Sequence, residues 1–334
     1  MKNKKQTYFI TGGTGSFSKK FIQTLLKNKL AKKIIIFSRD EYKQMIMKEL
    51  PFIKKNLHMF RFYIGDVRDK NRLDWAIQEN IDIVVHSAAL KQVPATEYNP
   101  FETVLTNIIG TQNLIEICLK KNIDKILLIS TDKAVAPINL YGSTKLTAEK
   151  LFISANIFKG NKKTKFSVVR YGNVMGSRGS VMPIFLEQNK NLSTPFTVTD
   201  KNMTRFNISL SEAAKFVNLC ISTMKGSEVF IPKLPSYKIL DLIKAINSKK
   251  KIKYIGIRPG EKTHEELIEP SDSNKIIEHK KYFVIDNLNK HKKKNNSAYK
   301  YKKMKSYNSL DNTDYLSVGQ INKLIKSYQL DFES

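Results

Sequence analysis

Short apolar runs alternate with amphipathic segments over the first half of the chain. Between Tyr8 and about residue 172 the apolar runs are YFIT, KIIIFS, FRFYIGD, IDIVVHSA, KILLIS and FSVVRYG, and helical spacing marks the segments between them. Runs that are continuously apolar are typical of strands buried on both faces. The alternation therefore predicts an α/β fold with a doubly wound parallel sheet.

A glycine-rich turn, ITGGTGSF, follows the first predicted strand and opens a helix. Glycines in this context let the backbone turn tightly and approach a pyrophosphate at the helix N-terminus. The residues expected to contact a dinucleotide here are Gly12, Gly13, Thr14, Gly15, Ser16 and Phe17. Ser18 stands where the pattern expects its last glycine. The motif and its context predict a Rossmann-type sheet.

The ends of the next three predicted strands carry further candidate cofactor contacts. These residues are Ser38, Arg39, Asp66, Val67, Ser87, Ala88 and Ala89. An Arg at the end of the second strand can pair with a 2′-phosphate, so Arg39 favours NADP. Asp40 and Glu41 follow directly. Because an acid there would bind a ribose 2′-hydroxyl, NAD stays open.

The regular alternation ends after RYGNV. We interpret residues 1–172 as an NADP-binding domain that also carries the catalytic residues, and residues 173–286 as mainly a smaller substrate-binding lobe. Eight Lys and no acid lie between Lys290 and Lys305. This charge run predicts that residues 287–334 form a basic, solvated C-terminal tail.

Tyr141 and Lys145 lie four residues apart, on one face of the helix predicted after the fifth strand. A cation ~4 Å from a phenol contributes up to ~4 kcal/mol at an effective dielectric near 20, or about three pK units. The pKa of Tyr141 would then approach neutrality. A phenolate beside a nicotinamide can take a proton from a substrate hydroxyl as hydride leaves the same carbon.

The composition excludes several other classes of function. The chain has a formal net charge of +28, but only eight of its 58 basic residues are Arg, the residue that nucleic-acid readers favour. We therefore expect no nucleic-acid partner, although a positive field suits anionic phosphate ligands. Cys118, Cys220 and His264 lack metal-ligand spacing, so no metal is predicted. Neither a signal peptide nor an apolar window of roughly 18 residues is present, which predicts a cytoplasmic protein without a membrane span.

The stretches TGGTGSF, HSAA and YGSTK, with Thr131, resemble the extended short-chain dehydrogenases/reductases. Longer stretches resemble the UDP-N-acetylglucosamine 4,6-dehydratases, in particular the soluble inverting enzymes that begin pseudaminic-acid synthesis. These stretches are SRDEYKQ, SAALKQVPATEYNPFE, STDKAVAPINLYGSTKLTAEKLF, RYGNVMGSRGSV, MTRF and RPGEKTHEELI. The likeness runs from about residue 6 to about residue 286.

The resemblance implies a lyase that forms a 4-keto sugar, eliminates the 6-hydroxyl and inverts C5, while its NADP stays bound and is recycled. Asp132 and Lys133 would be the acid and the base, beside Thr131, Tyr141 and Lys145. These roles require a raised pKa for Asp132, and a pKa for Lys133 that burial or the Lys145 charge lowers. A salt bridge between Asp132 and Lys133 is the structural alternative.

The resemblance also implies a set of contacts to UDP-N-acetylglucosamine. These are Lys91, which would also approach the nicotinamide, and Asn173, Arg178, Arg205, Arg258 and Glu261. Relatives form homo-oligomers, and we expect the same here. A retaining 4,6-dehydratase, a UDP-sugar 4-epimerase and a non-catalytic NADP-binding regulator remain as alternatives.

Overall fold

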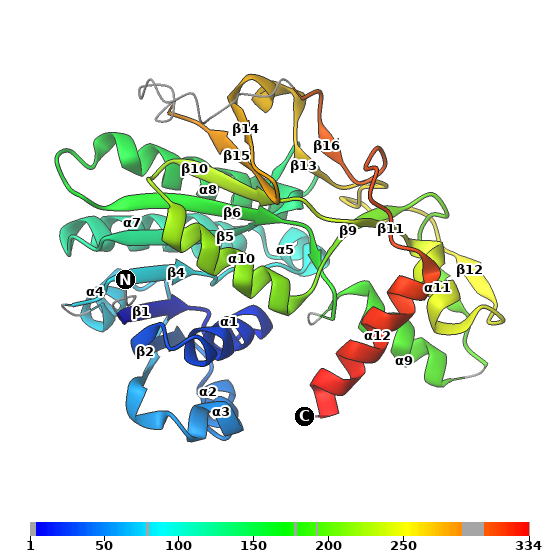
Figure 1. The fold of residues 1–334 in the computed structure, drawn as a ribbon, viewed down its shortest axis with the longest axis horizontal. Coiled ribbons are helices and arrows are strands. Elements are labelled where there is room, and N and C mark those ends of the chain that lie inside the picture. The colour runs from blue at the N-terminus through cyan, green and yellow to red at the C-terminus, as the bar shows by residue number, and fades with distance from the viewer. Residues whose placement is uncertain (1–4, 78–79, 177–178, 192, 289–303, 334) are drawn as a thin grey trace.

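A nine-stranded sheet forms the centre of the described chain, in the order β14-β15-β10-β6-β5-β4-β1-β2-β3 (Figure 1). The computed structural model describes residues 5–333 apart from 78–79, 177–178, 192 and 289–303. The strands are β1 (Gln6–Thr11), β2 (Ala31–Ser38), β3 (Phe60–Ile64), β4 (Ile83–His86), β5 (Lys125–Thr131), β6 (Lys165–Tyr171), β10 (Glu228–Pro232), β14 (Ile276–Glu278) and β15 (Tyr282–Asp286). All pair in parallel except β15 and β14, which run antiparallel at one edge.

The strand order reverses beside β1, which pairs with β2 on one side and with β4 on the other. In doubly wound sheets, ligands bind at such a switch point, outside the carboxyl ends of the strands. Four consecutive residues of β4 and five of β2 are buried, as the continuous apolar runs predict. The Rossmann-type α/β fold predicted from the sequence is confirmed.

Helices cover both faces of this sheet (Figure 1). Helices α1 (Ser16–Lys27) and α10 (Leu210–Thr223) pack together on one face, and α4 (Lys70–Ala76), α7 (Gly110–Lys120) and α8 (Leu140–Phe158) on the other. Shorter elements connect them: α2 (Glu41–Lys48), α3 (Pro51–Lys54), η1 (Leu57–Met59), α5 (Val93–Tyr98), α6 (Pro100–Val104), the π-helical η2 (Leu105–Ile109) and the 3₁₀ turns η3 (Asp132–Ala134) and η4 (Pro270–Lys275). Within the described ranges, no helix has the length and apolar composition needed to cross a membrane.

A smaller lobe has its own hydrophobic core. Its helices are α9 (Val181–Lys190), α11 (Ile239–Asn247) and α12 (Val318–Glu333), and α12 lies beside the other two in Figure 1. Short strands complete it: β7 (Asn173–Val174), β8 (Phe196–Val198), β9 (Thr204–Ile208), β11 (Ser236–Lys238) and β12 (Ile252–Tyr254). Fully buried Phe196 and Leu242 anchor this core. Two further strands, β13 (Glu266–Ile268) and β16 (Tyr307–Asn308), pair with each other and pack on the core of the central sheet.

The structure divides the second half of the chain differently from the expected boundary at residue 173. Strands β10, β14 and β15 extend the central sheet, and α10 packs on α1. Their apolar residues, such as Val217 and Ile231, belong to the core that packs around the central sheet. Residues 173–286 therefore contribute to both halves, because the chain returns to the sheet after building part of the smaller lobe.

The expectation of a solvated tail over residues 287–334 is wrong for residues 304–333. Strand β16 pairs with β13, and α12 packs on α11. Ile321 and Ile325 are spaced for one helix face and are buried in the core of the smaller lobe. The high Lys content of residues 290–305 dominated the composition, so the apolar face that follows was not predicted. Residues 289–303, which hold most of these Lys, lie outside the described residues.

Candidate active site

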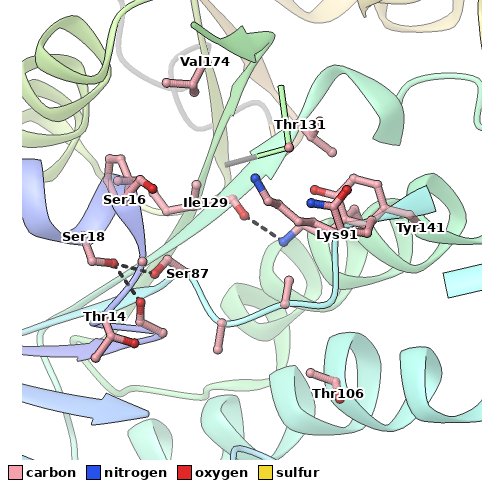
Figure 2. Close-up of a pocket in the computed structure, with 18 of the residues that line it drawn as sticks. Thr14, Ser16, Ser18, Ser87, Lys91, Thr106, Ile129, Thr131, Tyr141 and Val174 are labelled. Atoms are coloured by element: carbon pink, nitrogen blue, oxygen red, sulfur yellow. Dashed lines mark hydrogen bonds between the residues drawn. The ribbon is translucent and has the colours of Figure 1, made fainter. Parts of the chain in front are cut away.

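A cavity of about 680 Å³ opens at the carboxyl edge of the sheet. The glycine turn, the ends of β2 to β5 and the start of α8 line it. Figure 2 shows Thr14, Ser16 and Ser87 at one end and Lys91, Thr131 and Tyr141 at the other. Every predicted cofactor residue lines this cavity except Gly13. Gly13 instead packs on β2, where a Cβ would lie 2.7 Å from the Ile36 side chain.

The glycine turn packs closely against the backbone that follows β4. Gly12 has φ +64°, and a Cβ there would lie 2.9 Å from the Ala88 backbone. Gly15 caps α1 without any side-chain hydrogen bond, which leaves the first amides of the helix directed toward the cavity. Ser18 donates to the Gly12 carbonyl at 3.1 Å, and its hydroxyl lies 3.0 Å from that of Ser87. The serine in the glycine motif thus ties the turn to β4, and the site fits a dinucleotide pyrophosphate.

Arg39 and Asp66 meet at the ends of β2 and β3. Asp66 Oδ2 accepts hydrogen bonds from Arg68 at 2.7 and 2.9 Å, whereas the nearest Arg39 nitrogen is 3.6 Å away. Although burial opposes ionisation, Arg68 lowers the pKa of Asp66. The Arg39 side chain is half exposed and lines the cavity. Because Arg68 already neutralises Asp66, the Arg39 charge can face a ligand.

Tyr141 and Lys145 are both buried at the inner end of the cavity. Lys145 Nζ donates to the Ile129 carbonyl at 2.7 Å, and burial lowers the pKa of Lys145 to about 8. Burial raises the pKa of Tyr141 to about 12. The expected lowering of the Tyr141 pKa by Lys145 is therefore not found, because the Lys145 ammonium donates to the Ile129 carbonyl and burial of the phenol dominates.

Lys133 contacts three polar side chains at the inner end of this cavity. Its Nζ lies 3.0 Å from Glu265 Oε1, 3.2 Å from Asp132 Oδ1 and 3.3 Å from Asn173 Oδ1. Asp132 is fully buried, and Thr131 donates to its Oδ1 at 2.9 Å. Thr131 and Lys133 line the cavity, and Asp132 lies against both of them without lining it.

The pKa values of Asp132 and Lys133 both lie above their ordinary ranges. Burial and the Glu265 charge raise the pKa of Asp132, in the direction that the acid role requires. The expectation of a lowered pKa for Lys133 is wrong. Although burial opposes it, Asp132 and Glu265 raise that pKa, because two carboxylates contact the same ammonium.

A second cavity of about 250 Å³ adjoins the first, and Lys133 and Asn173 line both. Arg205, Arg258 and Glu261, predicted to contact the substrate, line this second cavity. Arg178 lies outside the described residues. The Arg205 side chain is 7% exposed and donates to the Thr204 and Thr263 carbonyls at 2.8 and 2.9 Å. The Arg205 guanidinium therefore stabilises the local backbone in addition to any contact with a ligand.

The predicted substrate residue Lys91 lines the first cavity. Burial, and then the charge of Lys133, lowers its pKa. Glu265 is the site residue that the sequence analysis missed. Its carboxyl lines the second cavity and contacts Lys133, which lies 132 positions earlier in the chain. The available signal was the acidic pair Glu265 and Glu266, which follows Arg258 by seven residues in RPGEKTHEE.

Residues 8–287 match the model of the family described as polysaccharide biosynthesis protein. A UDP-N-acetylglucosamine 4,6-dehydratase (inverting) of Campylobacter jejuni strain 81-176 is 50% identical over 83% of this chain and 81% of its own length. A UDP-glucose 4-epimerase of Rickettsia bellii is 42% identical over 84% of this chain and 82% of its own length. The predicted resemblance to the inverting dehydratases is confirmed.

Solved structures agree with this placement. The X-ray structure of Pen from Bacillus thuringiensis superposes with a TM-score of 0.89 at 39% identity, covering 99% of this chain and all of that one. DesIV, a dTDP-glucose 4,6-dehydratase of Streptomyces venezuelae solved with NAD, shares the fold with a TM-score of 0.67 at 17% identity, over 77% of this chain and 86% of that one. The family match and the dehydratase relative together show that this chain belongs to the polysaccharide biosynthesis protein family.

Proposed function

We propose that the chain is a UDP-N-acetylglucosamine 4,6-dehydratase that inverts C5. Its product would be UDP-2-acetamido-2,6-dideoxy-β-L-arabino-hex-4-ulose, in the first step of pseudaminic-acid-type nucleotide sugar synthesis. The observation that carries this proposal is the contact of Asp132 with Lys133 at the junction of the two cavities. An acid and an amine in that place serve an elimination, and the printed name of the Campylobacter relative supports the same reaction.

The first cavity would hold NADP, with NAD as the alternative. The glycine turn would receive the pyrophosphate, and Arg39 the 2′-phosphate. A bound nicotinamide would supply the hydride chemistry, with C4 of the sugar as donor and C6 as the final acceptor, so that no net oxidation would occur. Tyr141 lies at the end of the cavity away from Thr14 and Ser16 of the glycine turn (Figure 2), where the ring would meet the sugar.

Tyr141 would take the proton of the sugar 4-hydroxyl during oxidation. Burial raises the pKa of its phenol, whereas the Lys133 charge and the nearby Thr131 hydroxyl lower it. Because its pKa is about 12 in the ligand-free chain, loss of the phenolic proton requires additional positive charge when the site fills. A nicotinamide cation supplies such a charge.

Asp132 and Lys133 would carry out the elimination. Oxidation at C4 acidifies the C5 hydrogen, Lys133 removes it, and Asp132 protonates the departing 6-hydroxyl, which leaves as water. Protonation of C5 on the opposite face then inverts that centre. Lys133 is an ammonium in the ligand-free chain, so it must lose a proton before it acts as a base.

The Rickettsia relative named UDP-glucose 4-epimerase favours a second candidate function. An epimerase needs Tyr141 and Lys145 for oxidation at C4 but has no elimination for Asp132 and Lys133 to perform. A retaining 4,6-dehydratase would use the same groups with the other stereochemistry at C5. A regulator without activity would need none of these four residues, so the presence of all four in the sequence supports an enzyme.

Product mass tests the proposal. The purified protein, supplemented with NADP, would be incubated with UDP-N-acetylglucosamine, and the nucleotide sugars analysed by mass spectrometry and sugar composition. We expect a product that has lost one water. Conversion to a galacto isomer of unchanged mass would establish the epimerase instead. A homo-oligomer remains a prediction, which light scattering on the same preparation tests.

A further inference from the structure

Glu265 is an almost fully buried carboxylate that the proposed chemistry does not yet use. It directly precedes β13, and its Oε1 lies 3.0 Å from Lys133 Nζ and 3.7 Å from Arg205 Nε. Its Oε2 is buried with no hydrogen-bond partner among the described residues. A buried carboxylate oxygen without a partner is costly, so its retention beside Lys133 indicates a role in the site.

Backbone contacts from the C-terminal segment hold Glu265 in this position. Its amide donates to Ser309 Oγ at 2.9 Å, and the Ser309 amide donates back to the Glu265 carbonyl at 2.8 Å. The Ser309 hydroxyl also lies 2.7 Å from that of Thr204 on β9. The carboxylate is thus fixed from two sides before any ligand binds, as a functional group must be.

Asp132 and Glu265 contact the same ammonium, and Asp132 Oδ2 is likewise buried without a partner among the described residues. The two carboxylates share the Lys133 ammonium, and Arg205 lies beside Glu265, so Asp132 is the less neutralised of the two and favours holding a proton. Glu265 has the closer contact with Lys133, and the charges of Arg205 and Lys262 also favour its ionised form. The proton therefore belongs on Asp132, whose only cationic contact in the described part of the chain is Lys133.

We propose that Glu265 is a positioning residue whose carboxylate keeps Asp132 and Lys133 in the charge state from which Asp132 donates a proton. The inference rests on the proposed role of Asp132 as the acid. The other titratable and charged groups that face this cluster are Lys91, Tyr141, Arg205, Tyr237, Glu261 and Lys262. Asp132 and Glu265 both contact the Lys133 ammonium. Removal of one of these carboxylates therefore changes the pKa of the other.

Infrared difference spectroscopy tests this without any turnover. In the purified protein with its bound cofactor at neutral pH, the carbonyl stretch of a protonated carboxyl would be assigned to Asp132 by its loss in Asp132→Asn. We expect Glu265→Gln to lose this band because Asp132 becomes ionised beside Lys133. Glu265→Asp keeps the charge and should retain the band. A band that persists in Glu265→Gln, or that is absent from the wild type, would overturn the inference.

The pH profile of kcat gives a second readout. The value of kcat should fall at high pH, where Asp132 loses its proton. Glu265→Gln should shift this alkaline fall in kcat to lower pH by about one to three units. Glu265→Asp should lower kcat without shifting the pH of the alkaline fall. If Glu265→Gln lowers kcat but leaves the pH of the alkaline fall unchanged, Glu265 has a structural role only and the inference is overturned. If the wild type shows the Asp132 band but does not dehydrate UDP-N-acetylglucosamine, the proposed function fails and the charge assignment stands.

Discussion

Gly142 packs so closely against Lys133 that a Cβ at position 142 would lie 2.1 Å from the Lys133 carbonyl oxygen. Gly142 is in the first turn of α8, where its amide donates to the capping Asn139 side chain at 2.7 Å. The start of α8 is therefore pressed onto η3. This contact sets the position of Tyr141 relative to Asp132 and Lys133, and explains why a glycine follows Tyr141.

Replacement of Gly142 by Ala should displace η3 or the start of α8. We expect a loss of stability of about 1–3 kcal/mol from overpacking, and a larger proportional loss of activity. Gly319→Ala is a matched control, since that helical glycine has open space around its Cβ position. Thermal unfolding and product formation would be measured for both variants. A Gly142→Ala protein with wild-type stability and activity would show that the contact is not needed.

Lys133→Met should stop elimination while leaving oxidation at C4 possible, because Tyr141 and Lys145 are untouched. Reduced nicotinamide would then accumulate without a 6-deoxy product, which absorbance and product analysis detect. Tyr141→Phe should instead suppress the hydride step. Lys125→Met is a suitable control, since Lys125 lies at the other end of β5 and donates to the Ile221 carbonyl. Normal product from Lys133→Met would remove Lys133 from the mechanism.

Arg39→Ala should weaken NADP more than NAD. A charge-assisted hydrogen bond is worth about 1.5–3 kcal/mol, so NADP affinity should fall by roughly 10- to 100-fold, while NAD affinity changes little. Calorimetric titration with each cofactor measures the ratio. Arg61→Ala serves as the control, because Arg61 on β3 contacts the Phe60 carbonyl and does not line the cavity. Unchanged discrimination would mean that another group binds the 2′-phosphate.

His86 should make the fold sensitive to acid. Burial, and then the Lys145 charge, lowers the pKa of His86 from 6.5 to about 3, and its ring contacts the hydroxyls of Thr11 and Thr111. As pH falls below 6.5, the unfolded chain takes up the proton first, so stability is lost between pH 6.5 and about 3. From pH 7 to pH 5 the wild type should lose about 2 kcal/mol more than His86→Gln. Parallel urea titrations at the two pH values check this, and equal losses would contradict it.

Sequence patterns predicted those features of the fold and the site that depend on residues close together in the chain. Continuous apolar runs identified strands such as β4 and β5, and the glycine turn identified the dinucleotide cavity. The contacts of Asp132 with Lys133 and of Tyr141 with Thr131 follow from short separations around one strand end. Such features follow from the geometry of β5 and α8, which the sequence pattern predicts directly.

Features that depend on distant segments were missed. Glu265 approaches Lys133 only because the chain returns across the lobe, and no local spacing predicts that contact. The same distance explains the error in the Lys133 pKa, since the carboxylate that raises it was not foreseen. The C-terminal helix had an apolar face at Ile321 and Ile325, but the preceding Lys run dominated the composition of that segment.

The most direct test of the account is proton NMR of the purified protein with UDP-N-acetylglucosamine in deuterated water, following C5 and the C6 methyl. The account predicts a 4-keto-6-deoxy sugar with deuterium at C5 and the L-arabino configuration. The D-xylo configuration would contradict the inversion and establish a retaining dehydratase. A galacto product without a C6 methyl would contradict the dehydratase itself.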